Sequence, residues 1–409
     1  MMRMTVLPGP LEGEVRAIPS KSQAHRLLIC AALGDRPAVL GCGALNRDIE
    51  ATADCLRGLG AGVEYDDGAF RITPVSGPVT GAVLDCGESG STLRFLLPVV
   101  CALGAEGRFL LRGRLPERPL SPLWEELERH GAVLGRPARE EIAFSGRLEP
   151  GDYVIPGDIS SQYISGLLFA LPLLARESTL TPTGRLESAG YLVMTRQAQA
   201  RFGLRWTGDR AGETWRLASG SRYRSPQRME VEGDWSNAAF WLAADALSPR
   251  RVRVTGLDPR SPQGDRAAAE LIPRIRLGGA AIDAGDIPDL VPPLAVVAAV
   301  SPGETRFVNA GRLRLKESDR LQSVCAMLQA LGADAEEKPE ELIVRGGNGL
   351  RGGTVDSCRD HRIAMSAAVA AAACREPVTV LGAEAVEKSY PAFWQDLRRL
   401  GGRIREEET

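Results

Sequence analysis

One short pattern occurs six times along the chain: an apolar run of helical character, then glycine, then a strand-like stretch. Glycine just past a helix end adopts the left-handed conformation easily because it has no Cβ, and a strand can leave directly from it. The pattern therefore predicts six units of helix, turn and strand. Successive glycines lie 71, 72, 75, 54 and 69 residues apart. The six copies centre on Gly60, Gly131, Gly203, Gly278, Gly332 and Gly401.

A repeat of about 70 residues is longer than a solenoid repeat and has room for two helices and several strands, which favours six α/β modules. A chain of 409 residues is long enough for two or three domains, so three modules per domain is the natural division. A boundary is expected near residues 230–234, where an apolar helix with the run AAFWLAADAL begins. Because helix caps carry glycine often, six caps without internal duplication remain an alternative.

Composition and charge indicate a globular protein and exclude several kinds of partner. Hydrophobic residues make up 44% of the chain and charged residues 25%. The formal net charge of -2 gives no basic field for nucleic acid, so any anion site must be a local cluster. The start shows no signal-like apolar region, and stretches such as 290–300 are too short to span a bilayer. We expect a cytoplasmic protein without a membrane or nucleic-acid partner.

The eight cysteines and three histidines show no spacing typical of a metal site. In a chain without a secretion signal, the cysteines are expected to be small buried residues that form no disulfides. We therefore expect no metal.

Three segments in the first half place polar residues at the start of an apolar helix, where backbone N–H groups and the helix dipole favour anions. Each segment alone is more often a Ser-capped helix or a turn without a ligand. The residues are Lys21, Ser22 and Arg26 in KSQAHR, Gly90 in the turn GESGSTLR, and Ser160, Ser161 and Gln162 in SSQ.

Two further positions in this half are weaker candidates. Arg118 lies in the Pro-rich segment LPERPL, an expected place for a mobile residue that closes on a substrate, although alone it is more often a solvated loop arginine. Tyr191, which follows Ser188 in LESAGYLVMT, either lines the pocket of SSQ or packs in the core.

The second half carries a denser set of charges. Asp289 lies at a predicted helix start, either as the helix cap or as a base. The segment RLRLKESDRL is predicted to place Lys316 and Arg320 on one helical face. This like-charge spacing costs stability unless an acid or an anion lies between the two, and Glu317 offsets only part of it. A solvated charged helix is the alternative.

Two clusters follow near the C-terminus. Asp360, His361 and Arg362 begin an Ala-rich helix of buried character, where charges need partners or a cleft. Lys388 in EKSYPAFW is expected in a loop, with an ordinary surface lysine as the alternative.

In this order along the chain, KSQAHR, GESGSTLR, ERP, SSQ, IPD, KESDR, DHR and EKSYP resemble the motifs of the 5-enolpyruvylshikimate-3-phosphate synthases. The resemblance spans residues 21–391. It implies an α/β fold of two inverse domains, each of three βαβαββ repeats, with the active site in the cleft between them. The implied domains are residues 1–15 with 232–409, on the phosphoenolpyruvate side, and 16–231, on the shikimate 3-phosphate side.

The resemblance implies an enzyme that transfers the enolpyruvyl group of phosphoenolpyruvate to the 5-hydroxyl of shikimate 3-phosphate, on the route to chorismate and aromatic amino acids. No cofactor is implied. The two substrates bring roughly five to six negative charges, which dispersed Lys and Arg must balance. The residues implied for phosphoenolpyruvate are Lys21, Gly90, Arg118, Gln162, Arg320, Arg362 and Lys388. Those implied for shikimate 3-phosphate are Lys21, Ser22, Arg26, Ser160, Ser161, Gln162, Ser188, Tyr191, Asp289 and Lys316.

For the proton steps we expect Asp289 as the base toward the 5-hydroxyl and Glu317 as the acid toward C3 of phosphoenolpyruvate. Lys21 and His361 are expected to assist or to orient. By the same resemblance, Gly90 keeps the space that admits glyphosate in this family, so inhibition competitive with phosphoenolpyruvate is expected. The enzyme is expected to be a monomer.

Two positions depart from the family pattern. Glu88 stands where many members carry Asn, and Arg312 stands where some carry a substrate-binding Asn. The roles of these two side chains stay open.

Two other functions compete with this interpretation. The sister enzyme that transfers enolpyruvate to UDP-N-acetylglucosamine carries a reactive Cys before the position of Arg118, and residues 112–118 contain none. A noncatalytic anion-binding scaffold would not need Lys21, Asp289, Glu317 and Lys388 together.

Overall fold

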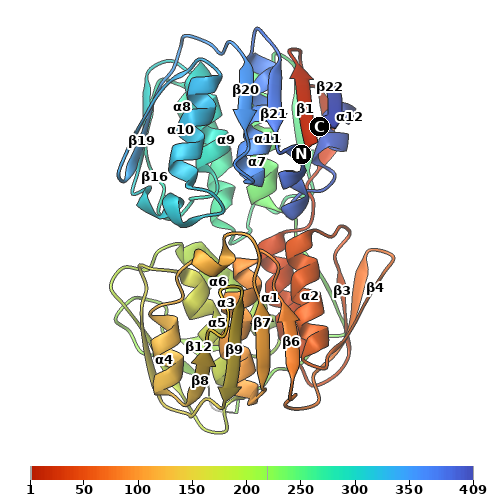
Figure 1. Cartoon of the computed structure of the whole chain (residues 1–409), viewed down its shortest axis with the longest axis vertical. Coiled ribbons are helices and arrows are strands. Elements are labelled where there is room, and N and C mark those ends of the chain that lie inside the picture. Colours follow the sequence, from red (N-terminus) through yellow and green to blue (C-terminus); the bar gives the residue numbers. More distant parts are fainter. Residues whose placement is uncertain (1, 219, 409) are drawn as a thin grey trace. The chain divides into compact units, whose positions relative to one another are not determined.

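The structure, a computed structural model, describes residues 2–218 and 220–408, and the chain divides into two compact units (Figure 1). Unit 1 is formed by Met1–Ile18 and Glu232–Thr409, and unit 2 by Pro19–Val231. Unit 2 is therefore one continuous stretch of chain, whereas unit 1 draws on both ends.

Unit 2 contains three four-stranded sheets with the same strand order. In each sheet the first two neighbours are parallel and the other neighbours are antiparallel. One sheet is β14 (Arg228–Glu230), β3 (Ala38–Gly41), β5 (Ala69–Thr73) and β4 (Gly62–Asp66). The second is β6 (Ala82–Asp85), β7 (Gly107–Leu110), β9 (Glu141–Gly146) and β8 (Ala132–Gly135). The third is β10 (Asp152–Pro156), β11 (Thr179–Thr183), β13 (Trp215–Leu217) and β12 (Trp206–Thr207).

The helices of unit 2 divide into buried and peripheral ones. In the three helices α1, α3 and α5 almost all residues are buried, on every face of the helix rather than on one stripe. The helices are α1 (Lys21–Ala32), α2 (Arg47–Gly58), α3 (Gly90–Leu103), α4 (Leu123–Arg129), α5 (Ser161–Ala170) and α6 (Ala189–Arg201).

Unit 1 repeats this architecture with α7, α9 and α11 as its most buried helices. Its helices are α7 (Trp235–Leu247), α8 (Ala268–Arg276), α9 (Val291–Val300), α10 (Arg320–Ala330), α11 (His361–Ala370) and α12 (Phe393–Arg399). One four-stranded sheet is β16 (Ala280–Asp283), β17 (Glu304–Val308), β19 (Glu341–Arg345) and β18 (Asp334–Lys338). The other is β20 (Gly353–Asp356), β21 (Val378–Leu381), β1 (Met2–Leu7) and β22 (Arg403–Glu408).

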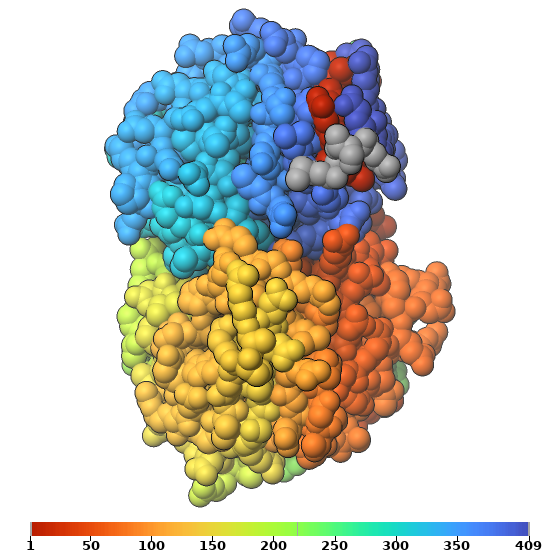
Figure 2. Space-filling view, viewed as in Figure 1, coloured from red at the N-terminus to blue at the C-terminus, as the bar shows by residue number. Residues whose placement is uncertain are grey.

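The N-terminal strand β1 completes a sheet made otherwise from the last sixth of the chain. It pairs antiparallel with β21 on one side and with β22 on the other, with Met4 opposite both Val380 and Glu406. In the space-filling view the red atoms of β1 lie directly beside blue atoms of the C-terminal segments (Figure 2). The third sheet of unit 1 has only two strands, β2 (Gly13–Arg16) and β15 (Val252–Thr255), which are parallel.

The six predicted units of helix, glycine and strand are confirmed. Each of the six glycines has a positive φ, between 81° at Gly203 and 130° at Gly278. They follow α2, α4, α6, α8, α10 and α12 and precede β4, β8, β12, β16, β18 and β22. The predicted α/β fold of repeated units is therefore confirmed, with the two-stranded sheet of unit 1 as the one reduced copy.

Each unit has its own hydrophobic core. Seven of the eight cysteines are buried, as predicted, and all eight are free thiols. The prediction is wrong for Cys358, which is exposed because it lies in the turn between β20 and α11 with φ 53°.

Candidate active site

The three helix starts predicted in the first half are confirmed in unit 2. A serine hydroxyl caps each helix by accepting a backbone N–H: Ser20 from Gln23 in α1, Ser89 from Thr92 in α3, and Ser160 from Gln162 in α5. Lys21, Gly90 and Ser161 are thus the first residues of their helices. The remaining backbone N–H groups of such a first turn lack helical partners and favour an anion.

Gln162 joins the starts of α5 and α3. Its amide Nε2 donates to the Ser91 hydroxyl at 2.9 Å, and its Oε1 accepts from Nη1 of Arg94 at 2.8 Å. Arg94 also donates through Nη2 to the Pro119 carbonyl at 3.1 Å. The buried Arg94 side chain therefore fixes both Gln162 and the segment that follows Arg118. Neither Ser91 nor Arg94 is among the predicted site residues, and only their proximity to Gly90 in the sequence pointed to them.

Arg118, at the end of the short 3-10 helix Leu115–Glu117, lies against Gly90. A Cβ on Gly90 would be 2.6 Å from Nη1 of Arg118 and 3.0 Å from Nη1 of Arg94, so any larger residue there would force the Arg118 guanidinium to move. Within residues 2–218 and 220–408, no carboxylate pairs with Arg118, and its buried Nε has no hydrogen-bond acceptor. The start of α3 therefore carries concentrated positive charge that an anion can neutralise.

Lys21 forms an ion pair with Asp48 of α2, with 2.9 Å between Nζ and Oδ2. Both side chains are largely buried, at 15% and 8% exposure. Asp48 was missed at the sequence level, because nothing in the first turn of α2 distinguishes it from an acidic residue that stabilises a helix N-terminus.

Arg26 is buried at 2% exposure and is held by three oxygens of unit 2. Its guanidinium donates to the Thr195 hydroxyl at 2.8 Å and to the carbonyls of Ser22 and Tyr191 at 2.6 and 3.2 Å. Burial lowers the pKa of Arg26 to about 10, and no carboxylate in the described part of the chain pairs with it. Ser188, with φ 54°, is the cap residue of α6. The structure thus brings the predicted residues Ser22, Arg26 and Tyr191 together at the junction of α1 and α6.

In unit 1 the charged residues converge on Arg320, the first residue of α10, which is 1% exposed. Its Nε donates to Oδ2 of Asp360 at 2.9 Å, and its Nη1 donates to Oδ1 of Asp289 at 2.7 Å. Its Nη2 donates to Oε2 of Glu317 at 2.6 Å. Although burial opposes the charge, Asp360, Glu317 and Asp289 raise the pKa of Arg320 above its ordinary value.

Asp289 is not the cap of α9, because the cap residue is Leu290 and no side chain caps that helix. Asp289 instead contacts three cations: Oδ1 is 2.7 Å from Arg320 and 3.8 Å from Lys316, and Oδ2 is 3.2 Å from Arg362. Burial alone would raise the pKa of the carboxyl, but Arg362, Lys316 and Arg320 outweigh it and hold the pKa well below its usual range. Asp289 is therefore ionised in the unliganded protein.

The predicted helical face shared by Lys316 and Arg320 is wrong. The helix begins only at Arg320 because Asp319 caps it, accepting from the backbone N–H of Gln322. Lys316 follows the 3-10 helix Gly311–Leu315 in extended conformation. The two cations nevertheless meet at Asp289, which is the acid between them that the sequence required. Burial lowers the pKa of Lys316 to about 8, against the opposing effect of Asp289.

Lys388 is likewise not in a loop, since it ends the 3-10 helix Ala383–Lys388. Its Nζ is 3.8 Å from Oε1 of Glu317, and both side chains are mostly buried. Glu317 therefore contacts Lys388 with one carboxylate oxygen and Arg320 with the other.

The cluster Asp360, His361 and Arg362 forms the start of α11, as predicted. Asp360 is fully buried, caps the helix by accepting from the Arg362 N–H, and also accepts from the Ser318 hydroxyl at 3.1 Å. His361 is 1% exposed, with Nδ1 3.8 Å from Oδ1 of Asp360. Asp360 was not predicted as a site residue, although its place beside two basic residues in a buried helix start was a usable signal.

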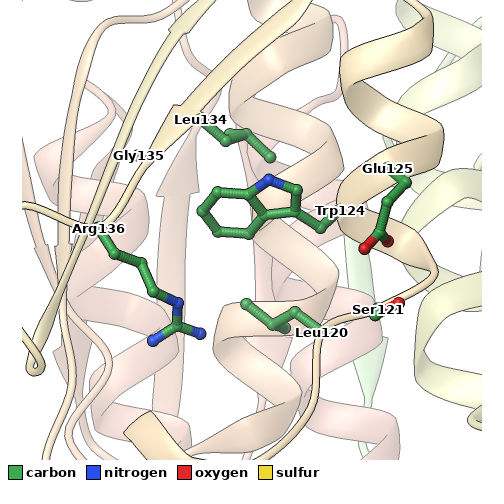
Figure 3. A pocket seen from close by; sticks show the side chains of 7 residues that line it. All are labelled: Leu120, Ser121, Trp124, Glu125, Leu134, Gly135 and Arg136. Carbon is green, nitrogen blue, oxygen red and sulfur yellow. The ribbon is translucent and has the colours of Figure 1, made fainter.

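One hollow of unit 2, of about 510 Å³, contains none of the predicted site residues (Figure 3). The ring of Trp124, one of the residues that line it, lies between the side chains of Leu120, Leu134 and Arg136 (Figure 3). The described residues form no group of three or more His, Cys, Asp or Glu placed to hold a metal ion. No helix among them is long and apolar enough to cross a membrane.

The two sets of residues define a class of protein. In unit 2 the guanidinium groups of Arg26 and Arg118 have no carboxylate partner among the described residues, and unit 1 offers four cations around the carboxylates of Asp289, Glu317 and Asp360. Focused cations suit phosphate and carboxylate groups, and partly accessible carboxylates among them can transfer protons. Such sites are typical of enzymes that act on anionic small molecules.

Comparisons with known proteins identify the family. The profile of EPSP synthase (3-phosphoshikimate 1-carboxyvinyltransferase) matches residues 7–278 and 271–397. The 3-phosphoshikimate 1-carboxyvinyltransferase of Clostridium kluyveri is 39% identical over 99% of both chains, and that of Clostridium perfringens is 38% identical over the full length of both. The solved EPSP synthase of Acinetobacter baumannii shares the fold, with a TM-score of 0.81 at 22% identity over the whole of both chains. The chain belongs to the EPSP synthase family.

The buried contact between Asp360 and Arg320 leads to a prediction about stability. Asp360→Asn keeps a residue that caps α11 but removes a buried carboxylate from a buried guanidinium, so we expect the free energy of unfolding to fall by about 3–5 kcal/mol. Chemical unfolding followed by circular dichroism measures the change.

Asp319→Asn is the matched control, because Asp319 also caps a helix of unit 1 but pairs with Arg314 at about one-third exposure. That variant should lose about 1 kcal/mol or less. Equal losses in the two variants would contradict a special role for the buried pair.

Proposed function

We propose that the protein transfers the enolpyruvyl group of phosphoenolpyruvate to the 5-hydroxyl of shikimate 3-phosphate and releases phosphate. Membership of the EPSP synthase family, with relatives matched over their full length, is the observation that carries this function. The reaction belongs to the shikimate route toward chorismate and the aromatic amino acids.

The charges of the two units support the binding of two anionic substrates. Phosphoenolpyruvate and shikimate 3-phosphate together carry roughly five to six negative charges. Arg26 and Arg118 have no carboxylate partner in the described part of unit 2, so each gains a counter-ion when an anion binds. We assign to shikimate 3-phosphate the residues Lys21, Ser22, Arg26, Ser160, Ser161, Gln162, Ser188, Tyr191, Asp289 and Lys316.

For phosphoenolpyruvate the same reasoning favours guanidinium groups. Arg118 beside Gly90 can present a planar pair of donors to a carboxylate or a phosphate, and Gln162 lies next to them through Arg94. We assign to this substrate the residues Lys21, Gly90, Arg118, Gln162, Arg320, Arg362 and Lys388.

The proposed chemistry is an addition followed by an elimination. The 5-hydroxyl attacks C2 of phosphoenolpyruvate while C3 gains a proton, and the tetrahedral intermediate then loses phosphate and the C3 proton. Asp289 is ionised and can accept the hydroxyl proton. The negative charge of bound substrates partly balances Lys316, Arg320 and Arg362, which raises the pKa of Asp289 and makes it a stronger base.

Glu317 is the proposed acid toward C3. Its carboxylate contacts Arg320 and Lys388, two residues assigned to phosphoenolpyruvate, so it is placed beside that substrate's proposed ligands. Lys21 and His361 are proposed to assist the proton steps or to orient the groups that carry them out. We propose that the reaction needs no cofactor. That the protein is a monomer and lies in the cytoplasm stays a prediction.

A substrate assay tests the function. The protein mixed with phosphoenolpyruvate and shikimate 3-phosphate should release phosphate, and the mixture with UDP-N-acetylglucosamine should not. Phosphate release only with the sugar nucleotide would move the chain to the sister activity, and release with neither would overturn the enzymatic function.

The proposed proton roles lead to a second prediction. Asp289→Asn and Glu317→Gln should each lower kcat by about 100-fold or more, because a positioned acid or base contributes roughly that much. Steady-state phosphate release at saturating substrates measures this. Glu336→Gln, an exposed acid of β18 in the same unit, is the control and should keep its kcat. A variant with near wild-type kcat would remove the role from the residue concerned.

Gly90 leads to a prediction about inhibition. Glyphosate should inhibit competitively with phosphoenolpyruvate. In Gly90→Ala the new Cβ would displace Arg118, so both the KM for phosphoenolpyruvate and the inhibition constant should rise. Inhibition measured at several phosphoenolpyruvate concentrations checks this, and an inhibition constant independent of phosphoenolpyruvate would contradict a shared site.

A further inference from the structure

Four buried polar side chains of unit 2 form a series of hydrogen bonds near the residues that we propose to bind phosphoenolpyruvate. Nδ1 of His25 in α1 is 2.7 Å from the Thr52 hydroxyl in α2, which is 2.6 Å from the Thr92 hydroxyl in α3. The Thr92 hydroxyl donates to the Ser89 hydroxyl at 2.8 Å. All four side chains are 0% exposed, so their hydrogen bonds are made with each other rather than with bulk water.

The direction of this chain follows from counting hydrogens. A threonine hydroxyl has one hydrogen to donate, and Thr92 gives its hydrogen to Ser89. Thr92 must therefore accept from Thr52, and Thr52 must accept from His25. His25 is thus the tautomer with hydrogen on Nδ1.

The chain keeps this direction across the working pH range. Burial lowers the pKa of His25 to about 3, with Lys21 and Arg26 adding to burial and Asp48 opposing it, so the ring is neutral. The buried Nε2 of His25 has no hydrogen-bond partner within the described residues. The ring is therefore held by Nδ1 alone, through Thr52.

The hydrogen-bond series lies one helical turn from Lys21, which is proposed to bind phosphoenolpyruvate. Lys21 is four residues before His25 in α1, and Asp48 is four residues before Thr52 in α2, so each pair shares a helix face. The Lys21–Asp48 ion pair and the His25–Thr52 hydrogen bond are then two successive contacts between the same two helices.

At its other end the chain reaches the turn that precedes Gly90. Ser89 accepts from both the hydroxyl and the backbone N–H of Thr92, which fixes the first turn of α3. That turn contains Gly90, which touches Arg118, and Ser91, which Gln162 contacts. Within the described residues, the Thr52 hydroxyl links this turn to α1, because it both accepts from His25 and donates to Thr92.

We propose that Thr52 is a positioning residue for phosphoenolpyruvate: its hydroxyl sets the first turn of α3 relative to Lys21 by bridging His25 and Thr92. This inference rests on the proposed function for its substrate. Replacing the hydroxyl by a methyl group of the same size keeps the packing, but it leaves Nδ1–H of His25 without an acceptor and Thr92 without a donor.

The kinetic experiment compares Thr52→Val, Thr52→Ser and the control Thr379→Val. Thr379 shares a hydroxyl hydrogen bond of 2.9 Å with Thr5 in unit 1, so its change to valine also removes a threonine pair. Thr52→Val should raise the KM for phosphoenolpyruvate about tenfold and change kcat by less than about threefold, the pattern of lost binding rather than lost chemistry. Thr52→Ser should restore the KM, and Thr379→Val should leave it unchanged.

A loss of thermal stability in Thr52→Val with an unchanged KM would overturn the inference, since that is the result of a purely structural role. If Thr52→Val does not fold, Thr92→Val breaks the same chain from its other end and decides in the same way, by a raised or an unchanged KM.

Nitrogen NMR of the histidine rings supplies a test that needs no turnover. The chain has only three histidines, so the His25 signals can be assigned by substitution. In the wild type the His25 ring should be neutral between pH 6 and 8, as its pKa of about 3 requires, and should carry its hydrogen on Nδ1. The Thr52→Val substitution should shift the Nδ1 signal. Hydrogen on Nε2 in the wild type would overturn the inference even if the assay with shikimate 3-phosphate succeeds. A wild type without turnover but with the Nδ1 tautomer would instead refute the proposed function alone.

Discussion

The buried guanidinium of Arg320 is the constraint on which the charged half of unit 1 depends. A cation that is 1% exposed is tolerated only when carboxylates and hydrogen bonds replace the lost water. Asp289, Glu317 and Asp360 do this, and each comes from a different segment of the chain. The positions of α9, α10 and α11 relative to one another are therefore set by electrostatics as well as by apolar packing.

The two units differ in how they hold their buried guanidinium groups. In unit 1 the cations meet carboxylates of the same unit, and Asp289 alone contacts three of them. In unit 2, Arg26 donates to a hydroxyl and two carbonyl oxygens, and Arg118 lies against Gly90. Neither is paired with a carboxylate among the described residues. An anion bound by unit 2 therefore gains charge neutralisation directly, whereas one bound by unit 1 must compete with carboxylates already present. In unit 1 the carboxylates of Asp289 and Glu317 remain in contact with these cations.

Sequence reasoning found the repeats and the helix starts because both depend on local rules. A glycine after a helix needs positive φ, and Ser20, Ser89 and Ser160 cap helices whose apolar runs were visible. The error at Lys316 was also local: Asp319 followed three residues later by Gln322 is a capping pattern, and it starts the helix at Arg320.

Asp48 and Thr52 could not be found in this way. Their partners Lys21 and His25 are 27 residues away, and only the packing of α1 against α2 brings them together. The roles of the predicted substrate residues likewise stay predictions, because a side chain's position fixes what it can contact and not which molecule arrives.

The position of β1 between β21 and β22 has a consequence for how the protein folds during its synthesis. Unit 2 is continuous, so all of its strands exist once residue 231 has been synthesised. Unit 1 cannot form its last sheet until β22 has left the ribosome. The strand β1 is synthesised first, so nearly all of the protein is translated before its partner β22 is available. Until β21 has been synthesised the first strand has neither of its final neighbours, and its unpaired backbone edges could pair with other strands. Arg3 and Thr5 lie on the opposite face of β1 from Met4 and Val6 and interrupt its apolar sequence. These polar residues make the unpaired strand less prone to aggregate.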